Sequence, residues 1–349
     1  MVEVVAVTRL SEQDRRRIEA IDPRVHLTDA GDWFDGEIAA TWPAQTARNW
    51  IREGAKAPPK ADRDAVLASA EVIFGGFPYP LDLRARSPRL KWFHQRNAGA
   101  NNLWRGDLWK SDVLVTTSRG YVNARPIAEY VVAALLYLAR DFAQAHRDRA
   151  NGVFDRRRHH PVLLAGKTAC IVGAGGIGRE AGRLLAALGM NVIGVRREPR
   201  AGEALPDGFA AVVGREQLLQ ALGQSEAAVV ACQLTRETEG LMNRAAFQAL
   251  KPGSMFVNIA RGEIVDEAAM LDALDSGHLK GAVLDVYVGE FESPPRPALW
   301  THPKILITPH DSGQTEVRQN LGINIFCDNL RAYLDGRPLA NVIDWERGY

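Results

Sequence analysis

The stretch Thr168-Ala-Cys-Ile-Val-Gly-Ala-Gly-Gly-Ile-Gly178 decides the fold of this chain. The apolar run Thr168–Val172 predicts a buried strand, and the leucines spaced through 176–188 predict a helix directly after the glycines. A second apolar run at 191–195 predicts the next strand. G-x-G-x-x-G alone is a weak signal. The order strand, glycine loop, helix and strand is typical of a dinucleotide-binding fold and disfavours a purely structural glycine turn.

Each glycine in the motif has a physical role. Gly173 permits the tight turn, Gly175 lets a pyrophosphate approach the backbone, and Gly178 lets helix and strand pack closely. The helix that follows presents N–H groups and the positive end of its dipole to a phosphate. The loop therefore predicts a pyrophosphate site.

The residues after the second strand indicate which dinucleotide binds. An acid is expected there to hold the ribose hydroxyls, but the chain has Arg196 and Arg197, with Arg200 beyond them. A guanidinium offers paired donors to a 2′-phosphate, which a carboxylate would repel. We therefore predict NADP(H) as the preferred cofactor, with NAD(H) possible. The alternative is that these are ordinary surface arginines, partly neutralised by Glu198.

Three polar residues follow predicted strands in the second half: Arg261 after 255–259, Glu290 beyond 282–286, and His310 after 305–308. In open α/β sheets the ligand lies outside the carboxyl ends of the strands, so these residues point to one crevice. An arginine there can clamp a 2-oxo acid and polarise its carbonyl. A histidine can donate the proton as hydride arrives, and a glutamate can hold the imidazole in its protonated form.

Strands and helices alternate in both halves of the chain. The predicted strands of the first half are Val2–Val7, Val25–Thr28, Val72–Phe74, Leu90–Phe93 and Val113–Thr117. Such alternation is typical of a mainly parallel sheet with helices on both faces. A single core stops growing at about 250–300 residues, so a chain of 349 residues favours two α/β domains.

The stretch 33–64 has the least regular pattern. It contains Trp33, Trp42 and Trp50, and we interpret it as a long loop or a short-helix insertion. Its tryptophans either bury against the domain, as tryptophans usually do, or line a pocket or an oligomer contact.

Composition excludes several classes of partner. The 43 basic and 42 acidic residues leave a net charge of +1, so no overall field attracts nucleic acid or an anionic membrane. The longest apolar stretch, Tyr130–Ala139, is far shorter than the ~20 residues that span a bilayer. The first residues lack the apolar core of a signal peptide.

The cysteines and histidines give no sign of a disulfide framework or a metal site. Cys170, Cys232 and Cys327 are scattered and odd in number, which favours a reducing cytoplasm. The pair His159-His160 has no further ligand at metal-site spacing. We therefore expect no bound metal.

Taken together, these motifs resemble the D-isomer-specific 2-hydroxyacid dehydrogenase family. The resemblance is carried by Gly173–Gly178, Asn258-Ile-Ala-Arg-Gly-Glu-Ile-Val-Asp-Glu267, Asp285-Val-Tyr-Val-Gly-Glu290 and Thr308-Pro-His310. Upstream, Leu90-Lys-Trp-Phe, Asn97-Ala-Gly-Ala100 and Ile127-Ala-Glu-Tyr match the family's substrate loop and linking helix. The order of the motifs along nearly the whole chain makes this resemblance far more specific than the glycine loop alone.

The resemblance implies roles for individual residues. Arg261 would bind the substrate, Glu290 would pair with the histidine, and His310 would donate the proton. The cofactor would meet, besides the loop glycines, Gly176 and Ile177 at its pyrophosphate, Asp285 at the nicotinamide carboxamide, and Cys232 and Ile259 mainly through backbone. Backbone N–H groups around Ala98 and Gly99 would hold the substrate carboxylate.

Some positions depart from the family pattern. Where the family often has Gly-Val-Asp, this chain has Gly99-Ala100-Asn101-Asn102. Cys232-Gln233 replace Leu-Pro, and Asp311 follows the histidine. These changes weaken any transfer of substrate identity. Arg96, beside the carboxylate loop, is either a selector for a second anionic or hydroxyl group or a plain surface arginine.

The resemblance also implies an architecture and an activity. We expect two doubly wound parallel-sheet domains, with a Rossmann cofactor domain (121–312) inserted into a discontinuous flavodoxin-like substrate domain (1–120 and 313–349). The expected reaction is reduction of a 2-oxo acid to a D-2-hydroxy acid by NADPH in a homodimer, with glyoxylate or hydroxypyruvate as the default substrates. A bulkier aromatic or branched oxo acid is the alternative substrate. The alternative function is a non-catalytic dinucleotide-sensing or corepressor-like module, although such a module does not need all three of Arg261, Glu290 and His310.

Overall fold

The structure is a computed structural model that describes residues 1–51, 57–120, 124–199, 202–316 and 321–348. Arg200 lies outside these ranges. Contacts divide the chain into two compact units. The first unit comprises Met1–Val122, Phe291–Ser293 and Val317–Tyr349, and the second comprises Asn123–Glu290 and Pro294–Glu316. The assignment of 1–120 and 313–349 against 121–312 as separate domains stays a prediction. No sequence pattern predicted that Phe291–Ser293 would group with the first unit.

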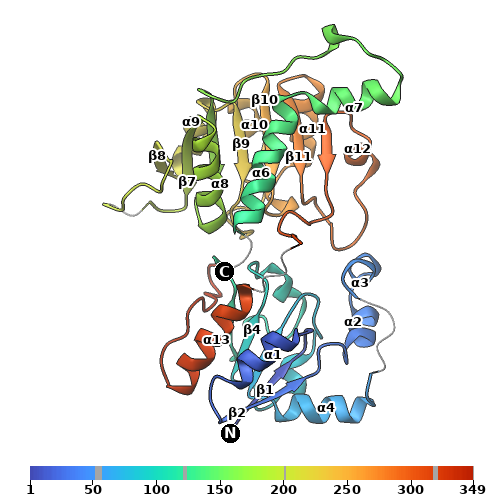
Figure 1. The fold of residues 1–349 in the computed structure, drawn as a ribbon, viewed down its shortest axis with the longest axis vertical. Coiled ribbons are helices and arrows are strands. Elements are labelled where there is room, and N and C mark those ends of the chain that lie inside the picture. Colours follow the sequence, from blue (N-terminus) through green and yellow to red (C-terminus); the bar gives the residue numbers. More distant parts are fainter. Residues whose placement is uncertain (52–56, 121–123, 200–201, 317–320, 349) are drawn as a thin grey trace. The chain divides into compact units, whose positions relative to one another are not determined.

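The first unit contains a five-stranded parallel sheet in the order β2-β1-β3-β4-β5 (Figure 1). Its strands are β1 (Val2–Ala6), β2 (Val25–Asp29), β3 (Val72–Gly75), β4 (Trp92–Gln95) and β5 (Leu114–Thr117). Its helices are α1 (Glu12–Glu19), α2 (Asp35–Thr41), α3 (Ala44–Trp50), α4 (Lys60–Ser69), α5 (Leu83–Arg86), η1 (Asn101–Arg105) and α13 (Leu321–Leu334). This is the flavodoxin-like strand order, as expected.

Alternate residues of β1, and Val7 directly after it, enter the two hydrophobic cores of the first unit. Val4 and Ala6 pack with residues of α1 and α13, whereas Val5 and Val7 pack with residues of α2 and α4. Side chains of a strand point alternately to opposite faces, so a strand buried on both faces is apolar throughout. The sheet is therefore covered by helices on both sides.

The second unit contains a seven-stranded parallel sheet in the order β12-β11-β10-β9-β6-β7-β8. Its strands are β6 (Thr168–Val172), β7 (Asn191–Arg196), β8 (Ala211–Gly214), β9 (Ala227–Val230), β10 (Ser254–Asn258), β11 (Leu279–Leu284) and β12 (Ile305–Ile307). Its helices are α6 (Ala124–Ala139), α7 (Phe142–Ala150), η2 (Arg156–Arg158), α8 (Gly176–Ala187), η3 (Arg215–Gln217), α9 (Leu218–Gly223), α10 (Arg244–Ala249), η4 (Gly262–Ile264), α11 (Glu267–Asp275) and α12 (Pro297–Trp300).

The order of these strands reverses between β6 and β9, which is where a doubly wound sheet binds its ligand. Residues of α6 and α8 share one core with the sheet, and residues of α9, α10 and α11 share the other. The predicted fold class, two doubly wound α/β units, is confirmed.

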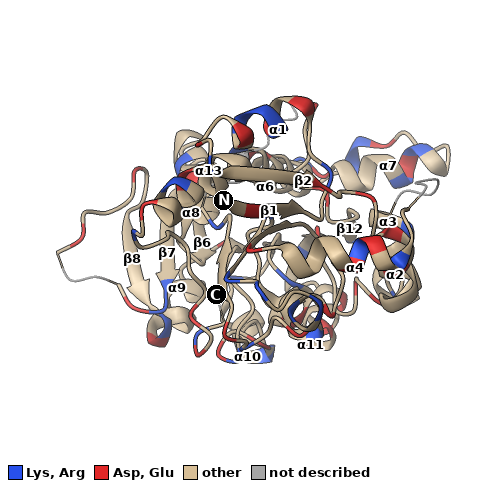
Figure 2. Ribbon diagram, turned by 90° about the horizontal axis from the view of Figure 1, so that it is seen from below, with Lys and Arg blue, Asp and Glu red and all other residues tan. Residues whose placement is uncertain are grey.

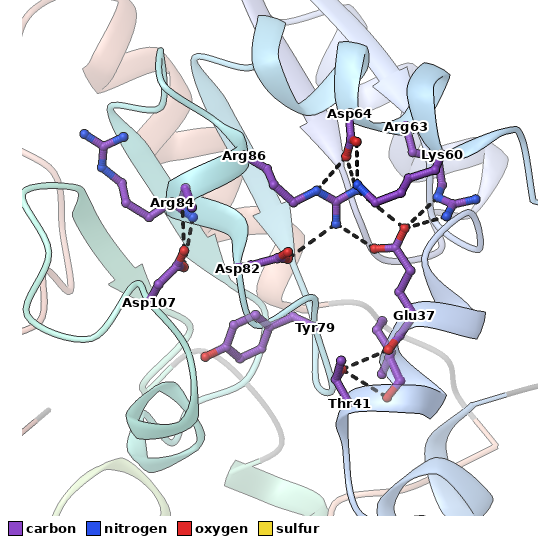
Figure 3. A network of polar contacts seen from close by, with 12 residues as sticks. Glu37, Thr41, Lys60, Arg63, Asp64, Tyr79, Asp82, Arg84, Arg86 and Asp107 are labelled. Atoms are coloured by element: carbon purple, nitrogen blue, oxygen red, sulfur yellow. Dashed lines mark hydrogen bonds and ion pairs between the residues drawn. The ribbon is translucent and has the colours of Figure 1, made fainter.

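The insertion at 33–64 forms short helices, as one of the two interpretations held. Trp42 is 5% exposed, and its indole N–H donates to the carbonyl of Tyr79 at 2.7 Å. Arg86 of α5 joins the helices through Glu37 of α2 at 2.6 Å and Asp64 of α4 at 2.5 Å (Figure 3). Burial opposes ionisation of Glu37, but hydrogen bonds from Arg86 and Arg63 outweigh it and lower the pKa of this carboxyl. The insertion is therefore held by a part-buried ionic network, and Trp42 belongs to the core.

Charges of both signs share the same surface helices, for example α1 and α4 (Figure 2). Within the described ranges, no helix combines the length and the apolar character needed to cross a membrane.

Candidate active site

The glycine loop connects β6 to α8 in the second unit. Gly173 has φ +107°, and a Cβ there would lie 2.5 Å from the backbone nitrogen of Cys232. A Cβ at Gly178 would collide with the carbonyl of Gly173. A Cβ at Gly175 would meet nothing within 4 Å, so this glycine is not required by packing inside the protein. Gly173 and Gly178 are thus required by the fold, whereas Gly175 keeps an exposed stretch of backbone accessible to a ligand.

The N-terminus of α8 supplies the donors at this loop. Gly175 precedes the helix in an extended conformation, and Gly176 is exposed while Ile177 is half-buried. The first turn carries no acidic side chain. Its N–H groups have no intrahelical acceptors and lie at the positive end of the dipole, so the loop suits a pyrophosphate.

Arg196 ends β7 and Arg197 follows it, but each is engaged by a carboxylate. Arg196 donates to Glu203 at 2.8 Å, and Arg197 lies 2.9 Å from Glu237. The ion pairs described for these two arginines are with Glu203 and Glu237, and partial neutralisation by Glu198 stays a prediction. The counter-charges come from positions further along the chain.

Cys232 and Ile259 follow β9 and β10, the strands next to the switch point. Cys232 touches the turn at Gly173, and the backbone N–H of Ile259 donates to the carbonyl of Val230 at 3.2 Å. Burial raises the pKa of the Cys232 thiol to about 12. Both residues therefore offer backbone, rather than a reactive side chain, at the carboxyl edge of the sheet.

Asp285 follows β11 and holds the loop that carries the histidine. Its Oδ1 accepts from the hydroxyl of Thr308 at 2.6 Å, from the N–H of Asp311 at 2.9 Å and from the N–H of Ser312 at 3.2 Å. Burial raises the pKa of this carboxyl against the effect of these donors. The phenol of Tyr130 in α6 in turn lies 2.6 Å from the Thr308 hydroxyl. Asp285 is thus first a structural anchor, and its predicted contact with a carboxamide stays a prediction.

His310 and Glu290 are brought together in this unit. Nδ1 of His310 lies 3.2 Å from Oε1 of Glu290, which is 5% exposed. His310 has φ +55°, an uncommon conformation for a residue with a Cβ, and its N–H contacts the carbonyl of Asp285 at 3.1 Å. The backbone thus holds the imidazole of His310 in place while about a third of its side chain stays exposed.

Arg261 begins a short turn after β10. Asn258 fixes this turn, because its amide donates to the carbonyl of Arg261 at 2.9 Å and accepts from the N–H of Ala260 at 3.0 Å. A side chain at Gly262 would collide with the backbone of Tyr287 and Val288. The turn of Arg261 therefore packs directly against the loop that leads to Glu290.

The substrate-loop residues lie in the first unit, after β4. Gln95 and Asn102 form a buried amide pair with bonds of 3.1 and 3.0 Å, and Gln95 also donates to the carbonyl of Gly99. This pair fixes the loop that contains Ala98 and Gly99. Arg96 lies next to it, and burial lowers the pKa of its guanidinium while Asp14 opposes that effect.

Comparison with known proteins assigns the chain to a family. Residues 132–312 match the model of the D-isomer specific 2-hydroxyacid dehydrogenase, NAD binding domain. The chain belongs to this family. It is 32% identical over 302 residues to the D-3-phosphoglycerate dehydrogenase of Archaeoglobus fulgidus, covering 84% of this chain and 53% of that one. The chain therefore spans about half the length of the curated relatives it matches.

Solved structures of the family resemble the whole chain. A D-isomer specific 2-hydroxyacid dehydrogenase from Xanthobacter autotrophicus Py2, in complex with NADPH and MES, is 28% identical with a TM-score of 0.75 and covers 100% of this chain and 99% of its own. A family member from Aeromonas salmonicida is 27% identical with a TM-score of 0.74, covering 98% of each chain. The glycine loop and the exposed α8 terminus fit the NAD(P) cofactor of this family.

Some residues of this candidate site were not found from the sequence. Asn258 orders the Arg261 turn, and Tyr130 and Thr308 extend the bonding around Asp285. All three lie inside motifs that carried the resemblance, but their signal was a position at a strand end or on a helix, without a charge to mark it. Across the described ranges, no cluster of three or more His, Cys, Asp or Glu side chains could hold a metal ion.

Proposed function

We propose that this chain reduces a 2-oxo acid to a D-2-hydroxy acid and prefers NADPH to NADH. The observation that carries the proposal is the 3.2 Å pair of His310 and Glu290, on loops tied to Asp285 and packed against the Arg261 turn, in the unit that contains the glycine loop. A proton donor, its acidic partner and a substrate-binding cation then lie at one edge of the sheet.

The reaction divides between the cofactor and the side chains. When bound, the reduced nicotinamide supplies a hydride to the carbonyl carbon. Since Nδ1 of His310 faces Glu290, Nε2 carries the proton to the developing alkoxide. The Glu290 carboxylate holds the ring orientation and stabilises the imidazolium before transfer.

Several polar groups are proposed to bind the substrate. Arg261 pairs with the carboxylate of the oxo acid and polarises the carbonyl, as a guanidinium fork allows. By the family resemblance, backbone N–H groups at Ala98 and Gly99 hold the substrate carboxylate, and Arg96 selects a second polar group. Glyoxylate and hydroxypyruvate are the default substrates, with bulkier aromatic or branched oxo acids as alternatives.

The loop Gly173–Gly178, including Gly176 and Ile177, holds the pyrophosphate, and Cys232 and Ile259 border the cofactor through backbone. The NADPH preference rests on Arg196 and Arg197 at the end of β7. The solved Xanthobacter relative, described as a complex with NADPH, supports this preference.

The assembly is proposed to be a homodimer in the cytoplasm. Phe142, Phe154 and Leu163, in and after α7, are 51%, 107% and 69% exposed, which is unusual for large apolar side chains and favours cover by a second copy. The proposed location fits the three cysteines, which are free thiols: Cys170, Cys232 and Cys327. Light scattering of the purified chain tests the dimer, and a monomer at micromolar concentration would contradict it.

A panel of 2-oxo acids assayed with NADPH and with NADH tests the activity. We expect turnover of at least one small oxo acid, with the higher kcat/KM for NADPH. Nucleotide binding without turnover of any oxo acid would favour a dinucleotide-sensing module instead. A higher kcat/KM for NADH would contradict the cofactor preference alone.

A further inference from the structure

The two arginines proposed to recognise the cofactor already have anionic partners. Arg196 uses Nη1 for Glu203, and Arg197 uses Nε for Glu237. Each guanidinium binds an oxyanion best through two parallel N–H groups. A carboxylate that occupies one of these donors leaves an incomplete fork for a phosphate.

Glu203 connects two elements of the second unit. Its Oε1 accepts from Arg179 of α8 at 2.7 Å while its Oε2 accepts from Arg196 at 2.8 Å. Hydrogen bonds from Arg179 and then Arg196 lower the pKa of this carboxyl, so it is ionised at neutral pH. The carboxylate thus lies between the helix that follows the glycine loop and the end of β7.

Glu237 makes a similar contact with the next arginine, Arg197. It lies in the turn after β9, where its backbone N–H donates to the Thr235 hydroxyl at 3.2 Å. Its Oε2 lies 2.9 Å from Arg197 and 3.5 Å from Arg215, which begins η3. Two glutamates from different segments therefore face consecutive arginines.

We propose that Glu203 and Glu237 are specificity-determining residues that compete with a 2′-phosphate for Arg196 and Arg197. The inference rests on the proposed role of these arginines. The 2′-phosphate of NADPH must displace the carboxylates or share the arginines with them. The ribose hydroxyl of NADH can instead donate to a carboxylate, as it does to the acid that is usual at the end of this strand and absent from β7. Both glutamates therefore lower the NADPH preference below what the arginines alone would give.

The test compares Glu203→Gln and Glu237→Gln with the parent enzyme. Glutamine keeps the size and one acceptor oxygen but removes the charge. We expect the ratio of kcat/KM for NADPH to that for NADH to rise about 1.5- to 5-fold in each variant, the range of a partly exposed ion pair, and further in the double variant. Titrated nucleotide binding should show the same shift for NADPH, with weaker or unchanged NADH binding.

Glu239→Gln is the matched control. Glu239 is exposed two residues from Glu237, and it forms no ion pair with any residue that the structure describes. Its substitution removes the same charge and should leave the ratio unchanged. An equal rise in this variant would mean that the general field, and not competition for the arginines, sets the preference, and would overturn the inference.

Arg196→Ser separates this inference from the proposed cofactor preference. If Arg196→Ser lowers the NADPH ratio while both glutamine variants leave it unchanged, only the inference fails. A fall in the ratio for Glu203→Gln also overturns it, because Glu203 would then position Arg196 for the phosphate. If the parent enzyme prefers NADH but both glutamine variants shift toward NADPH, the preference fails and the inference stands.

Discussion

The carboxyl edges of the two sheets are built from different kinds of polar group. In the second unit, charged residues after β11 and β12 bind one another: Asp285 anchors the loop of His310, and His310 faces Glu290. In the first unit, the loop after β4 is fixed by the neutral amides of Gln95 and Asn102. Under the proposed function, the charged groups lie where a proton is transferred, and the neutral amides fix a loop whose backbone N–H groups bind the substrate carboxylate. Substitutions at the edge in the second unit should change the chemistry of the reaction. Substitutions at the edge in the first unit should change substrate binding or stability.

The largest effect is expected for His310→Ala. Loss of a positioned proton donor typically lowers turnover by about 10²–10⁴-fold, and kcat should carry most of that loss. Arg261→Ala should lower turnover too, but with a raised KM for the oxo acid. His302→Ala is the control, because His302 lies in the same unit and also faces a carboxylate, Asp275, at 3.2 Å. Steady-state kinetics of oxo-acid reduction decide, and near-parental reduction by His310→Ala would refute its role.

Glu290→Gln should have the next largest effect, on kcat. Glutamine keeps the hydrogen bond to His310 but removes the charge that stabilises the imidazolium. Proton donation uses the charged ring, so kcat for oxo-acid reduction should fall, by less than in His310→Ala. KM for the oxo acid should change little.

Asp275→Asn is the control for this variant, since it removes a carboxylate beside a different histidine. It should leave kcat unchanged. An unchanged kcat in Glu290→Gln, together with a large loss of substrate affinity, would mean that Glu290 contacts the substrate and that the assignment of roles is wrong.

The contrast between the edges also explains what the sequence could reveal. The glycine loop, Arg261, Glu290 and His310 stand out because each is a charged or conformationally special residue after an apolar strand. The parallel sheets followed from the alternation of strands and helices. Residues such as Asn258 and Gln95 act through hydrogen bonds to backbone, and an amide among other polar residues gives no pattern that predicts such a partner.

Partners distant in the sequence were beyond prediction for a different reason. Glu203 and Glu237 meet Arg196 and Arg197 only because the turns after β7 and β9 fold toward the same strand end. The nearest acid in sequence, Glu198, was the natural choice without that information. The ion pairs that hold the insertion at 33–64 could not be predicted for the same reason. They join Glu37, Asp64 and Arg86, which lie on separate helices.

Asn102→Ala should have a smaller effect, on substrate binding. The change removes the partner of Gln95 and loosens the loop that contains Gly99, while the second unit is untouched. A lost pair of buried hydrogen bonds of about 1 kcal/mol each predicts a rise of up to about 30-fold in KM for the oxo acid. KM for NADPH serves as the internal control and should stay within about twofold. An unchanged oxo-acid KM would show that this loop does not bind the substrate.

His94→Gln should have the smallest effect on turnover and a clear effect on stability. His94 is fully buried in the first unit, with Nδ1 2.7 Å from the Thr116 hydroxyl and Nε2 3.2 Å from that of Ser118. Burial lowers the pKa of this imidazole from 6.5 to about 3, so it stays neutral in the fold. Below pH 6.5 the unfolded chain binds a proton that the fold excludes, and stability therefore falls as the pH is lowered, by up to about 1.4 kcal/mol per pH unit.

Glutamine keeps a donor and an acceptor but does not titrate, so His94→Gln should lose this contribution to acid sensitivity. Urea unfolding at pH 7, 6 and 5 measures it, followed by tryptophan fluorescence, which reports mainly on the first unit because only Trp300 lies in the second. The parent should lose stability more steeply than the variant between pH 6 and 5, with equal kcat/KM at neutral pH. Parallel pH profiles would mean that His94 is protonated in the folded protein. The contrast between a charged edge in the second unit and a neutral edge in the first would then fail at His94, which is fully buried.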